Sequence, residues 1–443
     1  MSGELPGSVR RGYALGSVAT GTFGTVPGLL LLPYLTDTLG IAAVAAGFIV
    51  FAPKAWDVVL NPIAGRISDR SSSPRGRRRP FLLWGGLALA ACFALLFAGP
   101  TESAGIGAAY VVVLFLACAT AYAFFQVPYV AMPAEMTLDY GERTKLMTWR
   151  VAILAVAILI SGATAPILVN AYGGEASVAG YRTMGVFVAL LLVAGVVGAY
   201  FGTAKAPEFA TQTPTGSLRD QLKLVGAARD FRFLLLTFVI QALGIGAMLA
   251  GVAYVAKDLL DNPGAATILF AAFVGPALIF APLWERYAVT RGKRSGYFAS
   301  SWFLVAGGFG LFFGYSGMAP AVYAAAALVG IGYAGAQVFP MAMLPDVAAH
   351  DAKISGENRI GVFTGVWTAG ETLGLALGPG LFAVILALGG YVSTGQDVAV
   401  TQPDSALLAI AIGFSLVPAI LIALSLFVLR RYDLDTKLDL HAA

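Results

Sequence analysis

The sequence contains few charged residues, few histidines and few cysteines. Charged residues make up only 12% of the 443 residues, whereas a soluble domain carries about 25%, so water is not the main solvent of this chain. The two histidines, His350 and His441, are expected on the cytoplasmic side, which argues against a buried histidine relay or a histidine-ligated metal. Cys92 and Cys118 lie in different apolar runs and are expected to serve packing rather than a disulfide.

The sequence motifs that mark most enzymes are missing as well. There is no nucleotide-binding glycine loop, no metal-ligand cluster and no Ser-His-Asp arrangement with a usable histidine. No stretch is long and polar enough to form a sizeable soluble domain, which argues against a receptor. We therefore expect neither an enzyme nor a cofactor or metal site. The net charge of +4 gives no reason to expect a nucleic-acid partner.

What the chain does have is a series of long apolar runs. Hydrophobic residues make up 58% of the sequence, and its mean hydropathy is +0.80. A helix needs about 20 apolar residues to cross a bilayer, and these runs are continuous rather than alternating as in a barrel strand. The pattern predicts an all-α membrane protein with twelve transmembrane helices. They are predicted at about 12–36, 41–67, 80–99, 106–133, 144–171, 181–203, 231–256, 264–287, 296–316, 319–345, 359–389 and 405–429.

The positive charges are distributed unevenly between the two sides of the predicted membrane. All but four of the 28 Lys and Arg residues lie at the termini or in the loops after even-numbered segments. Arg182 and Lys257 lie in the opposite loops, and Lys54 and Arg150 lie inside segments. Because cytoplasmic loops carry an excess of Lys and Arg, we expect both termini in the cytoplasm and the chain in the cytoplasmic (inner) membrane.

A long connection divides the segments into two sets of six. We predict an N-terminal bundle at 1–203, a cytoplasmic linker at 204–230 and a C-terminal bundle at 231–443. From Ser217 the linker reads SLRDQLKLVGAARDF, with apolar residues at helical spacing beside arginines and lysine. This pattern predicts an amphipathic helix, either at the membrane interface or on the protein surface.

The two halves repeat each other. The segment after the second span has an acid-Arg pair followed by RGRR, and its counterpart 216 residues later has an acid-Arg pair followed by RGKR. The fourth span ends in QVPYVAMPAE and the tenth in QVFPMAMLPD, 211 residues apart. We expect the charged residues of these loops to form a cytoplasmic latch between helices. The predicted latch residues are Asp69, Arg70, Arg77, Arg78, Glu285 and Arg286.

Several stretches resemble a known family. They are YLTDTLG at 34–40, AWDVVLNP at 55–62, RGRRRPFLLWG, VPYVAMPAEMTLDYGERTKL and ETLGLALG at 371–378. In this order they resemble the glycoside–pentoside–hexuronide:cation symporters of the major facilitator superfamily. The resemblance implies the major facilitator fold, with two pseudo-symmetric six-helix bundles that rock around a central site. It also implies a monomer in the lipid bilayer that carries a sugar or glycoside together with a cation. A related branch transports lysolipids, which leaves a lysolipid or another organic solute as the alternative.

The chain departs from the melibiose-type pattern of that family at several charged positions. Asp57 keeps the first acid of the second helix, but Asn61 replaces the second acid. Gly21 and Gln126 stand where the pattern has acids on the first and fourth helices, and Thr372 replaces a lysine on the eleventh. Arg150 alone remains of the charged sugar-binding set. Melibiose-type galactoside recognition and sodium coupling are therefore not expected to carry over unchanged.

Asp57 is the predicted coupling carboxylate. Lys54, Asp57 and Asn61 share one helical face, and Asp57 lies about 18 Å from the cytoplasmic end of its helix, near the middle of the bilayer. Charged groups at that depth are costly and indicate function. The alternative is a Lys54–Asp57 ion pair with a packing role. The coupling ion is H+ or Na+, and a single carboxylate slightly favours the proton.

Five further residues are candidates for substrate binding. Arg150 could donate to hydroxyls or a carboxylate, or instead extend to the interface. Gln126 and Gln337, at repeat-related positions, could bind polar groups or join helices. Glu371 could titrate, accept from hydroxyls or pair with Arg150. Trp367 could stack on a sugar ring, although an aromatic residue in a span is more often a packing residue.

Overall fold

The computed structural model describes most of the chain, and the described part is helical. The described residues are 5–69, 71, 73–74, 76–101, 103–137, 140–172, 177–207, 226–355, 360–393 and 400–434. The chain divides into two compact units, which are Met1–Thr213 with Val392–Thr401, and Pro214–Tyr391 with Gln402–Ala443.

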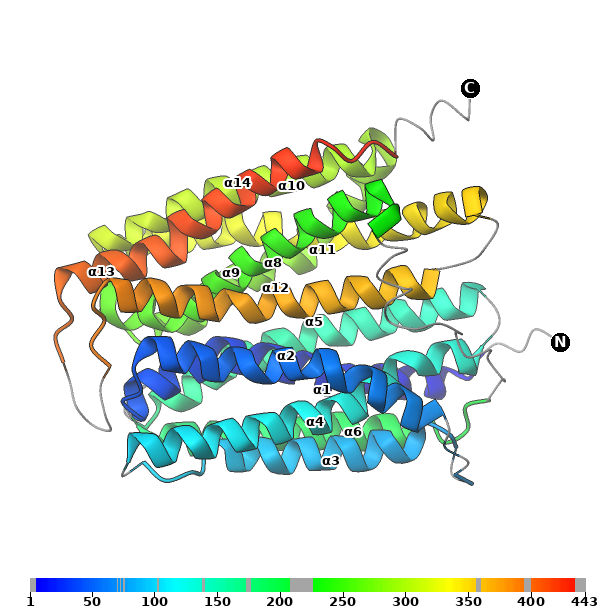
Figure 1. Cartoon of the computed structure of the whole chain (residues 1–443), viewed down its shortest axis with the longest axis horizontal. Coiled ribbons are helices and arrows are strands. Elements are labelled where there is room, and N and C mark those ends of the chain that lie inside the picture. Colours follow the sequence, from blue (N-terminus) through cyan, green and yellow to red (C-terminus); the bar gives the residue numbers. More distant parts are fainter. Residues whose placement is uncertain are drawn as a thin grey trace. The chain divides into compact units, whose positions relative to one another are not determined.

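The first unit is a bundle of six long helices (Figure 1). Its helices are α1 (Gly7–Pro33), which continues into the π-helical turn η1 (Tyr34–Thr38), α2 (Ala43–Asp69), α3 (Arg79–Leu96), α4 (Ala104–Met136), α5 (Tyr140–Asn170) and α6 (Val178–Gly202). Local sequence explains several helix starts. Pro80 occupies the first turn of α3, where its missing N–H costs nothing, and the Ser177 side chain accepts from the Gly180 amide to cap α6.

The second unit contains the other six membrane helices. They are α8 (Arg229–Tyr254) with the π-helical turn η2 (Val255–Leu259), α9 (Ala265–Arg291), α10 (Lys293–Gly310) with the 3-10 turn η3 (Leu311–Ser316), α11 (Ala319–Ser355), α12 (Ile360–Leu388), and a last span of α13 (Asp404–Ala411), the π-helical turn η4 (Ile412–Leu416) and α14 (Val417–Leu429). The first helix of each unit thus ends in a π-helical turn, η1 after α1 and η2 after α8.

The helices of the two units pack in the same pairwise pattern. In the first unit α1 contacts α5 and α6, α3 contacts α4 and α6, and α2 contacts α4. In the second unit α8 contacts α12 and α14, α10 contacts α11 and α14, and α9 contacts α11. Glycines permit close contacts between these helices, since a Cβ built on Gly12 would lie 2.4 Å from Gly202, and one on Gly378 would lie 2.5 Å from Gly246. The internal repeat seen in the sequence is therefore also a repeat of packing.

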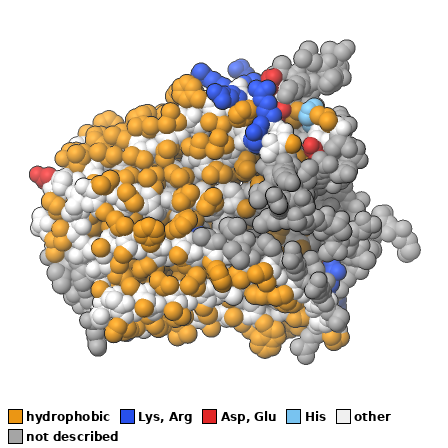
Figure 2. All heavy atoms as spheres, viewed as in Figure 1, with side chains coloured by type: hydrophobic (Ala, Val, Ile, Leu, Met, Phe, Trp, Pro, Cys, Tyr) orange, Lys and Arg blue, Asp and Glu red, His pale blue; other side chains and the backbone are white. Residues whose placement is uncertain are grey.

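The helices suit a lipid environment in length and in surface character. Eleven of them are long and apolar enough to cross a membrane. The remaining predicted span corresponds to α2, which has 27 residues and is about 40 Å long; its described apolar part runs over Ala43–Lys54. Large apolar side chains such as Leu190, Ile279 and Leu388 are exposed. Figure 2 shows hydrophobic side chains over most of the visible face, with Lys and Arg gathered near one end. The predicted all-α membrane fold is confirmed.

The predicted amphipathic helix of the linker starts at Ser217, which lies outside the described residues; these resume at residue 226.

Candidate functional site

Asp57, on α2 of the first unit, is a buried acid. Only 4% of its surface is exposed, and its Oδ1 atom has no hydrogen-bond partner among the described residues. Burying a carboxylate oxygen without a partner is costly. The geometry therefore leaves one oxygen of this acid available to a proton, a cation or a ligand.

Lys54 and Asn61 flank Asp57 by about one helical turn on either side, and both are partly buried. Lys54 interacts electrostatically with Asp57, and its ammonium lies over the Phe23 ring of α1, 5.3 Å from the ring centre. The lysine therefore also interacts with α1, and its ammonium group does not donate a hydrogen bond to Oδ1 of Asp57.

Arg150 projects from α5 onto a buried tyrosine of α4. The centre of its guanidinium lies 5.6 Å from the ring centre of Tyr129, within cation–π range. The Arg150 Nε atom is buried and has no hydrogen-bond partner among the described residues. Arg150 thus contacts the face of an aromatic ring while keeping a donor unused.

Tyr129 is itself fixed by contacts with α1. Its hydroxyl donates to the Tyr13 carbonyl at 2.9 Å, while the Tyr13 hydroxyl donates to the Tyr129 carbonyl at 3.2 Å. Ser17 Oγ lies 2.9 Å from the Tyr129 hydroxyl, and the two tyrosine rings stack with their centres 4.6 Å apart. Gly16 makes room for this ring, because a Cβ there would lie 2.4 Å from it. The platform beneath Arg150 is therefore rigid.

Gln126 adds another buried atom without a partner to the first unit. Its Oε1 is buried and, like Thr22 Oγ1 on α1, has no hydrogen-bond partner among the described residues. Together with Asp57 and Arg150, the unit has such atoms on α1, α2, α4 and α5. Buried polar groups are normally paired, so this set is the pattern expected of helices that bind a polar solute.

In the second unit Gln337 and Glu371 come together. Both line a small cavity among α8, α11 and α12, together with Phe238, Gln241 and Leu375. Tyr333, one turn before Gln337 on α11, is hydrogen-bonded to Gln337 and interacts electrostatically with Glu371. Two predicted residues from consecutive helices, α11 and α12, thus share one polar site with Gln241 of α8.

Trp367 is a packing residue in part. It is 1% exposed and stacks on Phe238, with ring centres 4.5 Å apart. Its indole Nε1 is nevertheless buried with no acceptor among the described residues, which is unusual for a buried tryptophan.

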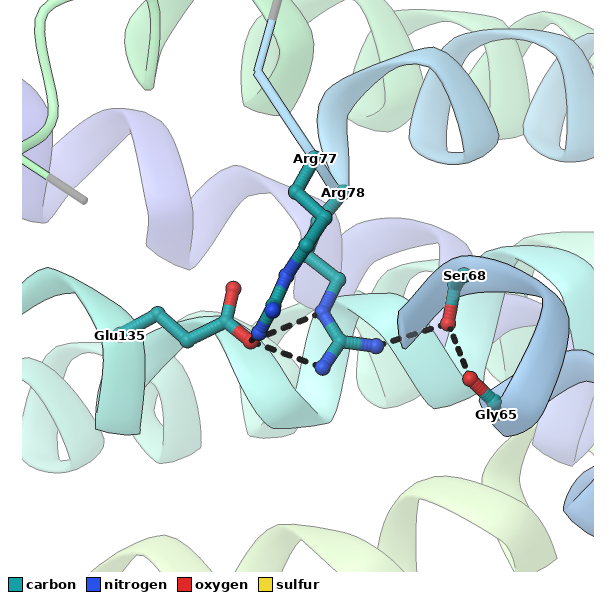
Figure 3. Close-up of polar contacts among 5 residues, drawn as sticks. All are labelled: Gly65, Ser68, Arg77, Arg78 and Glu135. Carbon is teal, nitrogen blue, oxygen red and sulfur yellow. Dashed lines mark hydrogen bonds and ion pairs between the residues drawn. The ribbon is translucent and has the colours of Figure 1, made fainter. Parts of the chain in front are cut away.

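The arginines after α2 converge on Glu135, near the C-terminal end of α4 (Figure 3). Arg78 donates to Glu135 Oε1 from Nε at 3.0 Å and from Nη2 at 2.7 Å, and to Ser68 Oγ at 2.7 Å. Arg77 pairs with the same Oε1. Burial by itself raises the pKa of Glu135, but the hydrogen bonds from Arg78 and Arg77 outweigh it and lower the pKa below the ordinary value. We call Ser68, Arg77, Arg78 and Glu135 the Glu135 cluster.

The second unit has an equivalent pair at repeat-related positions. Lys293 donates to Asp346 and, at 3.0 Å, to the Ala342 carbonyl. By contrast, Glu285 and Arg286 are exposed on α9, and no ion pair between them is found among the described residues. In the first unit, the Asp69 side chain and all of Arg70 lie outside what the structure describes.

Sequence reasoning did not single out Glu135, Asp346, Tyr129 or Tyr333 as site residues. The signal for the two acids was present, because each ends one copy of the repeated motif of the fourth and tenth spans. No comparable signal marked the tyrosines, whose roles depend on which side of α4 and α11 they occupy. Among the described residues no cluster of His, Cys, Asp and Glu could hold a metal.

The chain is similar over most of its length to known transport proteins. Residues 12–436 match the family model described as "MFS/sugar transport protein". The chain is 29% identical to the "Putative glycoside/cation symporter YagG" of Escherichia coli, with 97% of this chain and 92% of the relative covered. It is 23% identical to the "Sodium-dependent lysophosphatidylcholine symporter 1-A" of Danio rerio, with 96% and 85% covered. A solved bacterial homologue of the human lysosomal transporter Spinster, inward-facing and occupied, has a TM-score of 0.69 at 12% identity, with 97% and 96% covered. That likeness shows the fold.

Proposed function

The chain belongs to the MFS/sugar transport protein family, and on this basis we propose that it carries a sugar or glycoside across the cytoplasmic membrane together with a cation. It is a membrane transporter with the major facilitator fold and not an enzyme. We propose the identity of the cargo, the coupling by a cation and the residues that bind both. Transport proceeds by alternating access between the two bundles, with both termini in the cytoplasm and a monomer as the working unit.

One observation carries this proposal, namely the buried polar atoms without partners on the predicted site residues. Asp57, Gln126, Arg150 and Trp367 each have such an atom. In a low-dielectric interior, every one of these atoms represents free energy that a hydrogen-bonding ligand would recover. A sugar has many hydroxyls that both donate and accept, so it can satisfy acceptors such as Gln126 and donors such as Arg150 together.

Asp57 is the proposed coupling carboxylate. Its buried carboxylate has an unpaired oxygen and is stabilised when a proton or sodium ion binds, and Lys54 offsets only part of its charge through space. Ion binding would then favour the conformations in which the bundle closes around the neutralised site. Asn61 contributes an amide oxygen but no second charge, which favours the proton over sodium.

Arg150 is the proposed sugar-binding donor of the first unit. Tyr129 supports its guanidinium from one side, so the remaining N–H groups are oriented before substrate arrives. Preorganisation of this kind lowers the entropy cost of binding. In the second unit, Gln337 and Glu371 are the proposed polar contacts and Trp367 the proposed aromatic contact.

The cytoplasmic latch is proposed to be the Glu135 cluster in the first unit and Lys293 with Asp346 in the second. Each joins residues at or just before the start of a unit's third helix to the C-terminal part of its fourth helix. Glu285 and Arg286, which the sequence also predicts as latch residues, are exposed on α9.

A lysolipid or another amphipathic solute is the second candidate for the cargo. The similarity to a lysophosphatidylcholine symporter favours it, as does the replacement of sugar-binding acids by Gly21 and Gln126. The number of buried polar atoms favours the sugar, since an acyl chain satisfies none of them.

Uptake into proteoliposomes tests the proposal. Purified protein is reconstituted and offered labelled sugars, glycosides and lysolipids under imposed proton or sodium gradients. The proposal expects accumulation of at least one sugar or glycoside that depends on one of the gradients. If only lysolipids accumulate, the cargo is a lysolipid and not a sugar. If sugar uptake does not depend on the proton gradient or the sodium gradient, transport is not coupled to either ion.

A further inference from the structure

Gln241 of α8 is a fully buried glutamine whose amide orientation is determined by its neighbours. It is 0% exposed, and its Nε2 donates to Ser301 Oγ and to Ser425 Oγ, both at 3.0 Å. Ser301 donates its own proton to the Tyr297 carbonyl at 2.7 Å, and Ser425 donates to the Ile422 carbonyl at 2.6 Å. The two hydroxyls can therefore only accept from Gln241, so the amide nitrogen must face them.

The opposite end of this amide is an oriented acceptor without a donor. With Nε2 held by α10 and α14, Gln241 Oε1 is buried and has no hydrogen-bond partner among the described residues. Turning the amide would bring an oxygen against two serine oxygens and lose both bonds. The arrangement keeps Oε1 fixed and unpaired, which is the opposite of what a purely structural glutamine achieves.

Gln241 lines the same cavity as Gln337 and Glu371. The free space there fits about one water-sized group, which is too little for a sugar ring but enough for a single hydroxyl or hydroxymethyl group. The other walls are apolar, with Phe238, Ile245 and Leu375 among them. The amide oxygen of Gln241, the carboxyl group of Glu371 and the amide of Gln337 therefore surround a space that holds one small polar group.

From this geometry we infer that Gln241, Gln337 and Glu371 form a subsite for one hydroxyl group of the transported solute. The hydroxyl donates to Gln241 Oε1, while Ser301 and Ser425 are positioning residues that hold the amide. This inference rests on the proposed function, because it requires a hydroxylated solute, and it adds a ligand-contacting residue and its two supports.

The test pairs a change in the protein with a change in the ligand. A sugar found in the uptake panel is compared with its monodeoxy analogues as competitors, using the full chain in proteoliposomes. In the unmodified protein, one deoxy position is expected to weaken competition by about fivefold to thirtyfold. In Gln241→Leu, the parent sugar is expected to compete more weakly by a similar factor. The deoxy analogue that lacks the recognised hydroxyl should compete no more weakly in this variant than in the unmodified protein.

Two further variants make the result specific. Thr237→Val, one turn earlier on α8, removes a buried hydroxyl that donates only to the Phe233 carbonyl of its own helix, and it should keep the unmodified pattern. In the double variant Ser301→Ala/Ser425→Ala, removing the same hydroxyl from the sugar should weaken competition less than it does in the unmodified protein. This variant replaces Gln241→Leu in the test if Gln241→Leu does not fold.

The outcomes separate this inference from the proposed function. If Gln241→Leu weakens competition by every deoxy analogue to the same extent as by the parent sugar, the subsite is overturned. The subsite is also overturned if the variant changes only the dependence of uptake on the coupling ion. Both outcomes leave sugar transport intact. A chain that carries no hydroxylated solute at all overturns both.

Discussion

Replacing Glu135 by glutamine is expected to destabilise the first unit far more than the matching change destabilises the second. The Arg78 and Glu135 side chains are each only 7% exposed, and Glu135 accepts from Arg78 twice. Removing one partner of a buried ion pair leaves the other charge unpaired, which typically costs about 3–5 kcal/mol. The repeat-related variant Asp346→Asn breaks a pair whose side chains are 35% and 29% exposed. Water can solvate Lys293 there, so the expected cost is about 0–1 kcal/mol.

The assay is unfolding of the purified protein in one detergent, by heat and by denaturant, for both variants side by side. The double variant Arg78→Gln/Glu135→Gln should be more stable than Glu135→Gln alone, because it removes the buried charge that the single variant leaves unpaired. Equal stability of Glu135→Gln and Asp346→Asn would refute the reasoning, since the Glu135 carboxylate is the more buried of the two and pairs with two arginines rather than one lysine.

The same variant has a defined pH dependence. The pKa of Glu135 is lowered in the folded protein from its ordinary value of 4.5, so its stabilising contribution is fully present above that value. The contribution is lost as the pH falls from 4.5 through the folded-state pKa. The stability difference between the unmodified protein and Glu135→Gln should therefore be constant near neutral pH and shrink in acid.

Three further predictions concern the first unit. Asp57→Asn should abolish gradient-driven accumulation while preserving exchange of labelled for unlabelled substrate in proteoliposomes, and a variant that still accumulates substrate would remove Asp57 from coupling. Tyr129→Phe keeps the ring beneath Arg150 and should raise the apparent KM for uptake only a few-fold, whereas Tyr129→Ala removes a cation–π contact of about 0.5–2 kcal/mol and should raise it further; equal effects would exclude the ring as a support. Gly16→Ala places a Cβ 2.4 Å from the Tyr129 ring and should cost about 1–3 kcal/mol of stability, while Gly24→Ala on the same helix meets nothing within 4 Å and should be neutral or slightly stabilising; matching melting temperatures would contradict the packing at Gly16.

The sequence alone determined the membrane class, the helices and the repeat of this protein. Hydropathy sums over about 20 residues, so it is insensitive to single positions, and the predicted segments 106–133 and 359–389 agree closely with α4 at Ala104–Met136 and α12 at Ile360–Leu388. The helix α11 extends to Ser355, past the predicted apolar segment 319–345, because backbone hydrogen bonds continue a helix through polar residues that end an apolar run.

Only the tertiary structure decided which polar residues meet. Arg78 reaches Glu135 across 57 residues of sequence, and Gln241 reaches Ser425 across 184. Such pairs depend on how each helix is rotated and packed against its neighbours, and hydropathy does not contain that rotation. The sequence could single out Asp57 because a charge inside an apolar run is conspicuous by itself. It could not single out Gln241 or Tyr129, because a neutral side chain gains its role only from the groups that the fold places around it.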